Sequence, residues 1–409
     1  MAEEGDGFKA FPIALTRSES LRLDMPKESY VMPHDFMPGL AGVPAARSKI
    51  SDVNGETGVL EYRGIRIEEL TAKSTFLETA YLLLFNCLPT RLELEKFTGD
   101  VALHRRIKFK IVDMIKSLPE QGHPMDALQA AVAALGMFYP GRTVQDPENN
   151  YWSAVRLIAK LPTIVAAFAR IRRGDEYVPP RDDLEFSENF LYMLSERRPD
   201  PVVCQVFDAC LILHAEHTMN ASTFCGLITA STLADPYTVV ASAIGALKGP
   251  LHGGANEEVL AMLREIGTIQ GVRSCLEAKL EAKQPLMGFG HRVYKVKDPR
   301  AVILQQLAQK LFTHCGKSPL YALAEETERV ALELLSRKRV YPNVDFYSGI
   351  VYDAMGIPAD TFTSIFAMAR AAGWLAHWLE QMKENKLYRP DQIYEGEHNR
   401  SYLPLDQRQ

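Results

Sequence analysis

Four stretches of the sequence hold polar residues that a plain helical core does not require, and the first is Gly249-Pro250-Leu251-His252-Gly253-Gly254-Ala255-Asn256. Proline cannot continue the apolar helical region before it, and glycine lets a ligand approach the main chain. We therefore expect His252 on a tight turn near the amino end of the next helix, where the partial positive charge keeps the imidazole neutral. A neutral histidine can donate a hydrogen bond to an oxygen that becomes negative. The alternative is a structural histidine in a helix connector.

The second stretch runs from Leu286 to Arg300 and combines glycine-rich backbone with several cations. Its Gly-x-Gly segment is only weakly similar to a nucleotide loop, because no convincing strand precedes it and a third glycine is absent. Such backbone beside cations could hold an anion, and the alternative is a solvated basic loop. The histidine and the cations are His291, Arg292, Lys295, Lys297 and Arg300.

The third stretch, Tyr341 to Gly349, places Asp345 among apolar neighbours. Desolvation raises the pKa of an aspartate in apolar company unless a partner compensates, which would tune Asp345 as a base at neutral pH. The alternative is an aspartate that caps a helix after a proline turn.

The fourth stretch holds His214, His217 and Asn220, which would share one face of a buried helix over residues 201–233. A histidine pair at this spacing could bind a metal, but a third ligand at a diagnostic spacing is missing. Hydrogen-bonded core histidines are the other alternative to a role in catalysis.

The pattern of apolar residues predicts an all-α protein. Asn54-Gly55 and the strand-forming residues around it predict one small β-hairpin within residues 50–67. We expect residues 1–37 to form an extension, and the helix over 151–171 to be kinked or broken near Pro162. Further helices are predicted over residues 76–85, 104–118, from 124, 186–195, 236–247, 299–312, 318–338 and 360–383.

Composition excludes several classes of function. The chain has 409 residues, a net charge of −5 and a pI near 6.1, which argue against a general nucleic-acid binder. We expect no membrane span, because no run of 18 apolar residues occurs. The acidic amino terminus is unlike a secretory signal, and six cysteines without C-x-x-C spacing favour a reducing compartment, so we expect a cytoplasmic protein.

The motifs over residues 249–256, 288–294 and 343–349, in this order, closely resemble the citrate synthase family in its shorter bacterial and archaeal form. The resemblance extends over about residues 39–390 and includes the segments 60–64 and 213–217. It implies an acyltransferase that condenses acetyl-CoA with oxaloacetate and water, through an enol or enolate, to give citrate and CoA. The nearest alternative is a 2-methylcitrate synthase that uses propionyl-CoA, and an alternative of another class is a non-catalytic helical assembly protein.

The resemblance also implies residue roles. Asp345 would remove a proton from the acetyl methyl group, His252 would hydrogen-bond the thioester oxygen, and His291 would polarise the ketone of oxaloacetate. The implied oxaloacetate contacts are His217, Arg300, Arg370 and, from a neighbouring subunit, Arg389. Arg370 lies in an otherwise mostly apolar helix, where a charge demands a partner. The implied CoA contacts are Leu286, Met287, Gly288, Phe289, Gly290, Lys295 and Lys297, with no metal and no permanently bound cofactor.

The family fold implies a large and a small helical domain with the site in the cleft between them. The large domain would take residues 38–252 and 361–409, and the small domain residues 253–360. We expect a homodimer that binds neither nucleic acid nor membrane. The extension before Gly39 leaves open whether dimers join into a larger assembly.

Overall fold

The computed structural model describes residues 36–139, 144–316, 318–335 and 339–408. The chain forms two compact units, residues 1–45 and residues 46–409. The described part of the first unit contains the short 3-10 helix η1 (Pro38–Leu40). Most of the predicted extension, residues 1–35, lies outside the described residues.

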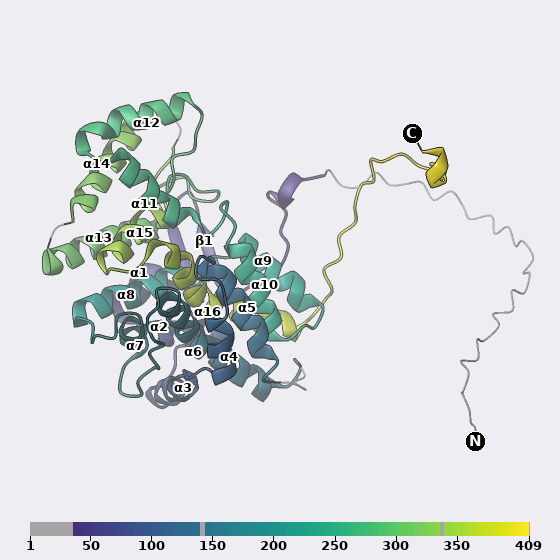
Figure 1. The fold of residues 1–409 in the computed structure, drawn as a ribbon, viewed down its shortest axis with the longest axis horizontal. Coiled ribbons are helices and arrows are strands. Elements are labelled where there is room, and N and C mark those ends of the chain that lie inside the picture. Colours follow the sequence, from purple (N-terminus) through teal and green to yellow (C-terminus); the bar gives the residue numbers. More distant parts are fainter. Residues whose placement is uncertain (1–35, 140–143, 317, 336–338, 409) are drawn as a thin grey trace, which may run out of the picture. The chain divides into compact units, whose positions relative to one another are not determined.

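Helices make up most of the second unit, so the predicted all-α class is confirmed (Figure 1). The first eight are α1 (Ile67–Lys73), α2 (Phe76–Phe85), α3 (Arg91–His104), α4 (Phe109–Lys116), α5 (Pro124–Gly136), α6 (Pro147–Ile171), α7 (Phe186–Ser195) and α8 (Pro201–His214). The others are α9 (Ala221–Ser231), α10 (Pro236–Leu247), α11 (Ala255–Ile266), η2 (Ile269–Gly271), α12 (Val272–Glu281), α13 (Pro299–Cys315), α14 (Pro319–Leu334), α15 (Val344–Ala354), η4 (Ala359–Thr361), α16 (Phe362–Lys383) and η5 (Leu405–Gln407). None of the helices in the described ranges is long and apolar enough to cross a membrane.

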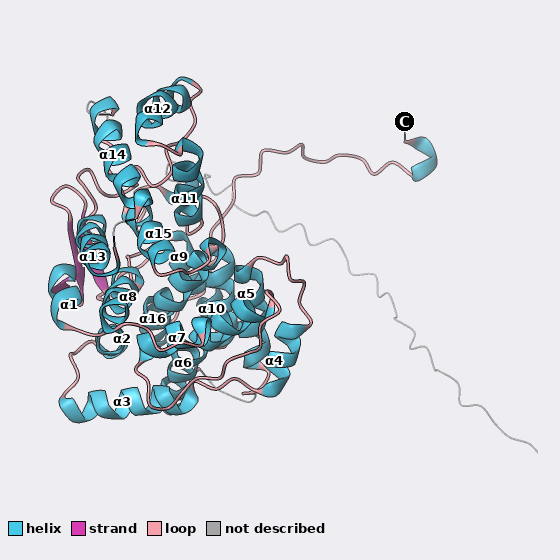
Figure 2. Ribbon diagram, turned by 60° about the vertical axis from the view of Figure 1, so that its left-hand side comes forward, coloured by secondary structure: helices cyan, strands magenta, loops and turns pink. Residues whose placement is uncertain are grey.

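The predicted β-hairpin is confirmed and extended by a third short strand. The antiparallel sheet has the order β1 (Ser51–Asn54), β2 (Val59–Tyr62), β3 (Ile65–Arg66), and Figure 2 shows it beside α1. The hairpin turn packs against the loop that follows His291, because Lys295 N donates to Gly55 O at 2.9 Å. A Cβ on Gly55 would lie 2.2 Å from the carbonyl oxygen of Val293, so glycine is required there.

Helix α16 forms the centre of the core and contacts α2, α6, α8, α9 and α10. All its residues from Phe362 to Trp378 are buried. The sequence explains this burial, because Arg370 is the only Asp, Glu, Lys or Arg in that span. The apolar helix α16 therefore places one charged group, the guanidinium of Arg370, in the interior.

The helix predicted over 201–233 is in fact two helices, so this expectation was wrong. α8 ends at His214 and α9 begins at Ala221, with a turn over residues 215–220. Asn220 caps α9 by accepting from Thr223 N at 3.1 Å, and Thr218 has a positive φ of 52°. His214 and His217 therefore do not share a helix face.

Of the two outcomes predicted at Pro162, a kink or a break, the break was wrong. α6 continues through Pro162, which is fully embedded among buried residues of the same helix. Packing of α6 against α3, α5, α7 and α16 outweighs the lost backbone hydrogen bond. The helix predicted over 104–118 is shorter than expected, because His104 belongs to the last turn of α3.

Candidate active site

His252 lies on the turn between α10 and α11, where Gly253 N donates to Leu247 O at 2.9 Å. Its ring Nε2 accepts from Ser222 N at 3.2 Å and lies 2.8 Å from Ser222 Oγ. Because Nε2 is an acceptor, the neutral ring carries its proton on Nδ1. Burial and the nearby charge of Arg370 lower the pKa of His252 to about 4. The ring is neutral as predicted, but it meets the amino end of α9 rather than that of α11.

Asp345 lies in the first turn of α15 and is 8% exposed. Asn343 caps the helix by accepting from Asp345 N at 3.0 Å, so the alternative of a capping aspartate does not apply. Oδ1 of Asp345 is buried and has no hydrogen-bond partner among the described residues. Burial, partly offset by Arg300 and Arg370, raises the pKa of Asp345 to about 7. This carboxylate has the properties of a general base that works at neutral pH.

His217 and His291 lie side by side, with ring centroids 5.2 Å apart. Nδ1 of His291 accepts from Val293 N at 3.0 Å and from Tyr294 N at 3.2 Å, which leaves the proton on Nε2. Nε2 of His217 lies 3.1 Å from the hydroxyl of Tyr294. Burial lowers the pKa of His291 to about 4 and that of His217 well below its ordinary value. Both rings are therefore neutral.

Two buried arginines provide positive charge. Arg300 forms a bidentate pair with Asp298, with Nε–Oδ1 at 3.1 Å and Nη2–Oδ2 at 2.7 Å. Arg370 donates from Nε to His214 O at 2.7 Å, but its buried Nη2 has no partner in the described part of the chain. Burial lowers the pKa of Arg370 to about 10. An unsatisfied buried guanidinium costs stability, and a bound carboxylate would satisfy it.

The glycine-rich stretch is tied to the segment that leads into α15. Gly290 N donates to Tyr341 O at 2.8 Å, and Asn343 N donates to Gly288 O at 2.9 Å. Gly288 has a φ of 78°, and a Cβ there would lie 2.7 Å from Val259. These contacts fix the His291 loop relative to the helix of Asp345.

The residues expected to contact CoA differ in their availability. Leu286 and Gly288 are buried, whereas Met287, Phe289 and Gly290 are half-buried and Lys295 is exposed. Lys297 is held by Glu328 at 2.5 Å and by Gln305 at 2.8 Å. Lys295 can therefore meet a phosphate freely, while Lys297 would first have to leave its ion pair.

Arg389 is not joined to the other site residues within one chain. It is exposed on the segment after α16 and makes no hydrogen bond or ion pair within the described ranges. The sequence analysis missed two supporting residues, Ser222 and Tyr294. Tyr294 closes the Gly-Phe-Gly-His-Arg-Val-Tyr motif, and this position is the signal that could have found it. No local signal connects Ser222 with His252, because the two residues are 30 positions apart.

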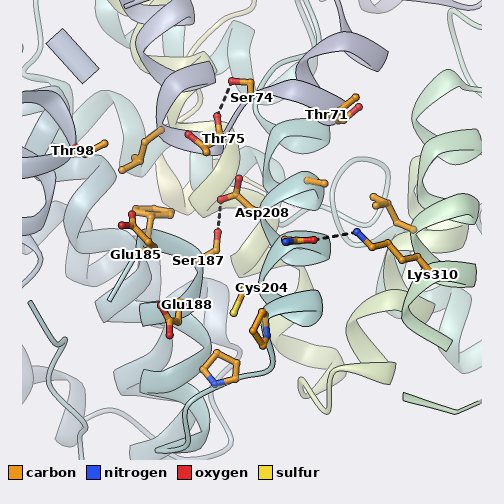
Figure 3. A pocket seen from close by; sticks show the side chains of 18 of the residues that line it. Thr71, Ser74, Thr75, Thr98, Glu185, Ser187, Glu188, Cys204, Asp208 and Lys310 are labelled. Atoms are coloured by element: carbon orange, nitrogen blue, oxygen red, sulfur yellow. Dashed lines mark hydrogen bonds between the residues drawn. The ribbon is translucent and has the colours of Figure 1, made fainter. Parts of the chain in front are cut away.

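A cavity of about 790 Å³ lies elsewhere, between α1, α2, α7, α8 and α13 (Figure 3). Its lining includes Asp208, which accepts from Ser187 Oγ at 2.5 Å and from Phe76 N at 2.8 Å. None of the predicted site residues lines it. In the described ranges, no group of three or more His, Cys, Asp or Glu residues is placed to hold a metal ion.

Comparisons with known proteins identify the family of this chain. Residues 39–391 match the family model described as the C-terminal domain of citrate synthase. A citrate synthase of Synechocystis sp. is 60% identical over 91% of this chain and 94% of its own, and one of Acidithiobacillus ferridurans is 50% identical over 91% and 99%. The structure resembles that of Thermoplasma acidophilum citrate synthase in a ternary complex with carboxymethyl coenzyme A and oxaloacetate, with a TM-score of 0.87 and 32% identity over 91% of this chain and 99% of the other. The chain belongs to the citrate synthase family and is an acyltransferase of that family.

Proposed function

We propose that this chain condenses acetyl-CoA with oxaloacetate and water to give citrate and CoA through an enol or enolate. The observation that carries the proposal is Asp345, a buried carboxylate with a free oxygen and a pKa raised to about 7 by burial. The charge of Arg370 acts on the pKa of Asp345, and the free Nη2 of Arg370 suits a carboxylate of the substrate. The related Thermoplasma protein, bound to a CoA analogue and oxaloacetate, supports the choice of substrates.

The first step removes a proton from the acetyl methyl group. Asp345 accepts this proton, and Nδ1–H of His252 donates to the thioester oxygen as it gains negative charge. A neutral histidine suits this role, because it can donate a hydrogen bond to the developing oxyanion without carrying a charge that burial disfavours. One donor of this kind typically lowers the barrier by about 3–4 kcal/mol.

The second step forms the carbon–carbon bond. Nε2–H of His291 polarises the ketone of oxaloacetate and then protonates the new alkoxide. His217, Arg300 and Arg370 hold the carboxylates of oxaloacetate, and the resulting citryl-CoA is hydrolysed by water. Met287, Phe289 and the surrounding backbone contact the adenine end of CoA, and Lys295 is the cation available for its phosphates.

The assembly we propose is a homodimer in which Arg389 of one chain completes the site of the other. Arg389 lies on an exposed segment that is rich in uncovered apolar side chains. These exposed side chains are Leu387, Ile393, Tyr394, Tyr402, Leu403 and Leu405. Contiguous exposed apolar residues mark contact surfaces, so a second subunit would cover this segment.

We also infer that the site lies between a large domain (38–252 and 361–409) and a small domain (253–360), and that the protein works in the cytoplasm. The five cysteines that the structure describes are free thiols, as a reducing compartment requires. His252 ends the proposed large domain, whereas His291 and Asp345 belong to the small one, so closure between the domains would bring the two substrates together.

Thiol release measures the reaction directly. We expect the purified protein to release CoA faster from acetyl-CoA than from propionyl-CoA when oxaloacetate is present. One methylene in a pocket changes discrimination by about 1–3 kcal/mol, so the preference should be measurable. Faster release from propionyl-CoA would make the protein a 2-methylcitrate synthase. A folded protein that releases CoA from neither substrate would favour a non-catalytic assembly protein.

A further inference from the structure

One short turn carries residues that serve both halves of the candidate site. His217 lies within the turn 215–220, and Ser222, which binds the ring of His252, lies in the first turn of α9 directly after it. Thr218 adopts the left-handed conformation, which is uncommon for a β-branched residue. A shift of this turn would therefore move the ring of His217 and the partner of His252 together.

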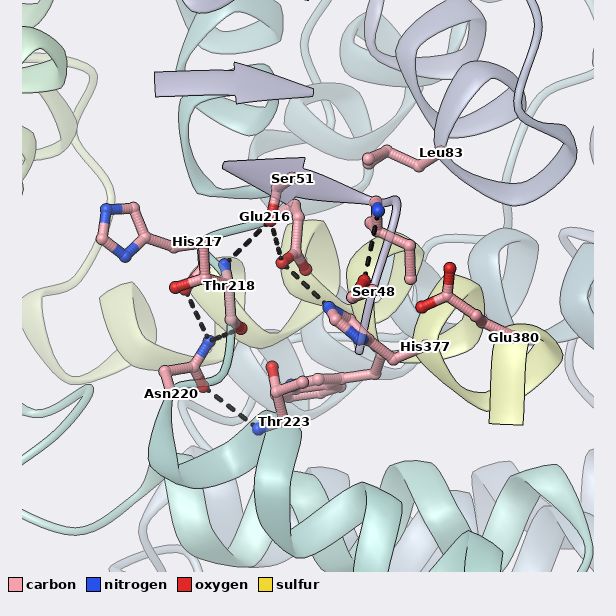
Figure 4. Close-up of polar contacts among 12 residues, drawn as sticks. Ser48, Ser51, Leu83, Glu216, His217, Thr218, Asn220, Thr223, His377 and Glu380 are labelled. Atoms are coloured by element: carbon pink, nitrogen blue, oxygen red, sulfur yellow. Dashed lines mark hydrogen bonds and ion pairs between the residues drawn. The ribbon is translucent and has the colours of Figure 1, made fainter. Parts of the chain in front are cut away.

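Glu216 anchors the turn from inside the protein. Its side chain is fully buried, and Oε1 accepts from Ser51 Oγ at 2.9 Å and from His377 Nε2 at 3.0 Å. Figure 4 shows the Glu216 carboxylate directed toward these two partners, while the ring of His217 points away from it. Ser51 also accepts from Thr218 N at 3.1 Å. The carboxylate thus connects the turn to strand β1 and to helix α16.

The backbone of the turn is fixed as well. Glu216 N donates to the hydroxyl of Tyr62 at 3.2 Å, and that hydroxyl lies 2.7 Å from Glu216 O. In the middle of α16, Gly373 N donates to Ala215 O at 3.1 Å. A Cβ on Gly373 would lie 2.2 Å from Glu216 Oε2 and 2.5 Å from Ala215 O. Only glycine leaves room for the turn to rest on α16 in this way.

Glu216 also contributes charge. Burial by itself would raise the pKa of Glu216, but His377, Arg370 and Ser51 together hold it below its ordinary value. Its second oxygen, Oε2, has no hydrogen-bond partner among the residues described. An ionised carboxylate that is fully buried is costly for folding even when it is paired, so a role in placing the turn would account for Glu216.

We propose that Glu216 is a positioning residue for both halves of the site. Its carboxylate packs against Gly373 and is bound by Ser51 and His377. These contacts fix the turn that places both His217 and Ser222, the partner of His252. The proposal rests on the function proposed above, in which His217 binds oxaloacetate and His252 stabilises the enolate. Glu216 itself touches neither substrate. It affects the reaction only through the conformation of the turn 215–220.

Gly373→Ala tests the contact with α16. Alanine is the better helix former, so propensity alone would not harm α16. The added Cβ must push the turn aside, and misplacement by about 1 Å can cost up to about 10²-fold in rate. We expect the KM for oxaloacetate to rise by at least about 10-fold and kcat to fall by a similar factor. The matched control is Gly226→Ala in α9, where a Cβ would make ordinary contacts of 3.6 and 3.7 Å and kinetics should stay at the wild-type level. A folded Gly373→Ala protein with wild-type KM and kcat would overturn the proposal.

Ser51→Ala gives a second test that does not depend on packing inside α16. It removes the bonds to Glu216 and to Thr218 N, whereas Ser48→Ala, the control, removes only a bond from Ile50 N. We expect Ser51→Ala to raise the KM for oxaloacetate by about 5-fold or more, because two hydrogen bonds that hold the turn are lost. Crystal structures of both variants should show His217 and Ser222 displaced only in Ser51→Ala.

The structural readout separates the two proposals. Absence of thiol release from the wild-type protein would refute the proposed function, while displacement of His217 and Ser222 in Ser51→Ala would still support the positioning role. An undisplaced turn in Ser51→Ala with unchanged kinetics would refute the positioning role, whatever the wild-type protein catalyses.

Discussion

Replacing the proposed base Asp345 should lower turnover and also remove a decrease in the free energy of unfolding that occurs as pH rises. Asp345→Asn keeps the shape of the side chain but cannot accept the proton, so turnover should fall by at least about 10²-fold. The same change removes a carboxylate whose pKa burial raises from 3.8 to about 7. Between these two pH values the unfolded chain releases a proton that the folded chain keeps. The free energy of unfolding of the wild-type protein therefore falls as pH rises through this window.

The size of the effect follows from the shift. Each pH unit inside the window is worth about 1.36 kcal/mol, so the full destabilisation above pH 7 is about 4 kcal/mol. Between pH 5 and pH 8 the wild-type protein should lose about 3 kcal/mol from this group, because the loss occurs mainly between pH 5 and pH 7. The asparagine variant lacks this loss. An unsatisfied buried amide costs it about 1–3 kcal/mol at every pH, which does not alter the pH dependence.

Urea denaturation of both proteins at pH 5 and pH 8 measures the effect, alongside thiol release. The difference in the free energy of unfolding should move by about 3 kcal/mol in favour of the variant from the lower to the higher pH. Other titrating groups are common to both proteins and cancel in this difference.

Asp353→Asn is the matched control on the same helix. Asp353 pairs with Arg264 at 3.0 Å near the surface, where an ion pair is worth about 0–1 kcal/mol. This variant should keep its activity and show no comparable change between pH 5 and pH 8. If the gap between wild type and Asp345→Asn stays constant with pH, Asp345 does not have a raised pKa and the assignment of the base loses its physical support.

Two further substitutions address the other parts of the site. His252→Ala should lower kcat by at least about 10²-fold while leaving the KM for oxaloacetate nearly unchanged, because the lost donor acts on the thioester; a large change in that KM alone, seen in steady-state kinetics, would contradict the role. Arg389→Ala should raise the KM for oxaloacetate by at least about 10-fold, since a charged hydrogen bond to the substrate is lost. Mixed dimers of Arg389→Ala with Asp345→Asn chains should regain activity in one of their two sites, and dimers that stay inactive would show that Arg389 does not cross to the partner.

Local signals made much of the fold predictable. The Asn-Gly turn predicted the hairpin, and the apolar periodicity predicted helices such as α7 and α10 with their observed limits. The three motif turns were also recognisable, because glycine and proline leave few backbone choices around His252, His291 and Asp345. These features depend on residues close together in the sequence.

The missed features depend on contacts between distant residues. The sequence around His217 has helical periodicity, but the turn 215–220 forms because Tyr62, Ser51 and Gly373 satisfy its backbone from three other elements. Pro162 stays inside α6 because packing on several sides stabilises the helix. The partner of His252 could not be predicted either, since Ser222 lies 30 residues away on another helix.

Asp345 and Arg370 each carry a buried polar atom without a partner within the described ranges, and the proposed function accounts for both. Oδ1 of Asp345 and Nη2 of Arg370 are both buried without a hydrogen-bond partner among the described residues, and no ion pair joins the two side chains. A direct salt bridge would give both groups a partner, but it would lower the pKa of Asp345 and occupy the guanidinium. Keeping them apart leaves a base for the methyl proton and a cation for a substrate carboxylate. The stability that Asp345→Asn should recover at pH 8 is therefore a measure of what this separation costs the folded protein.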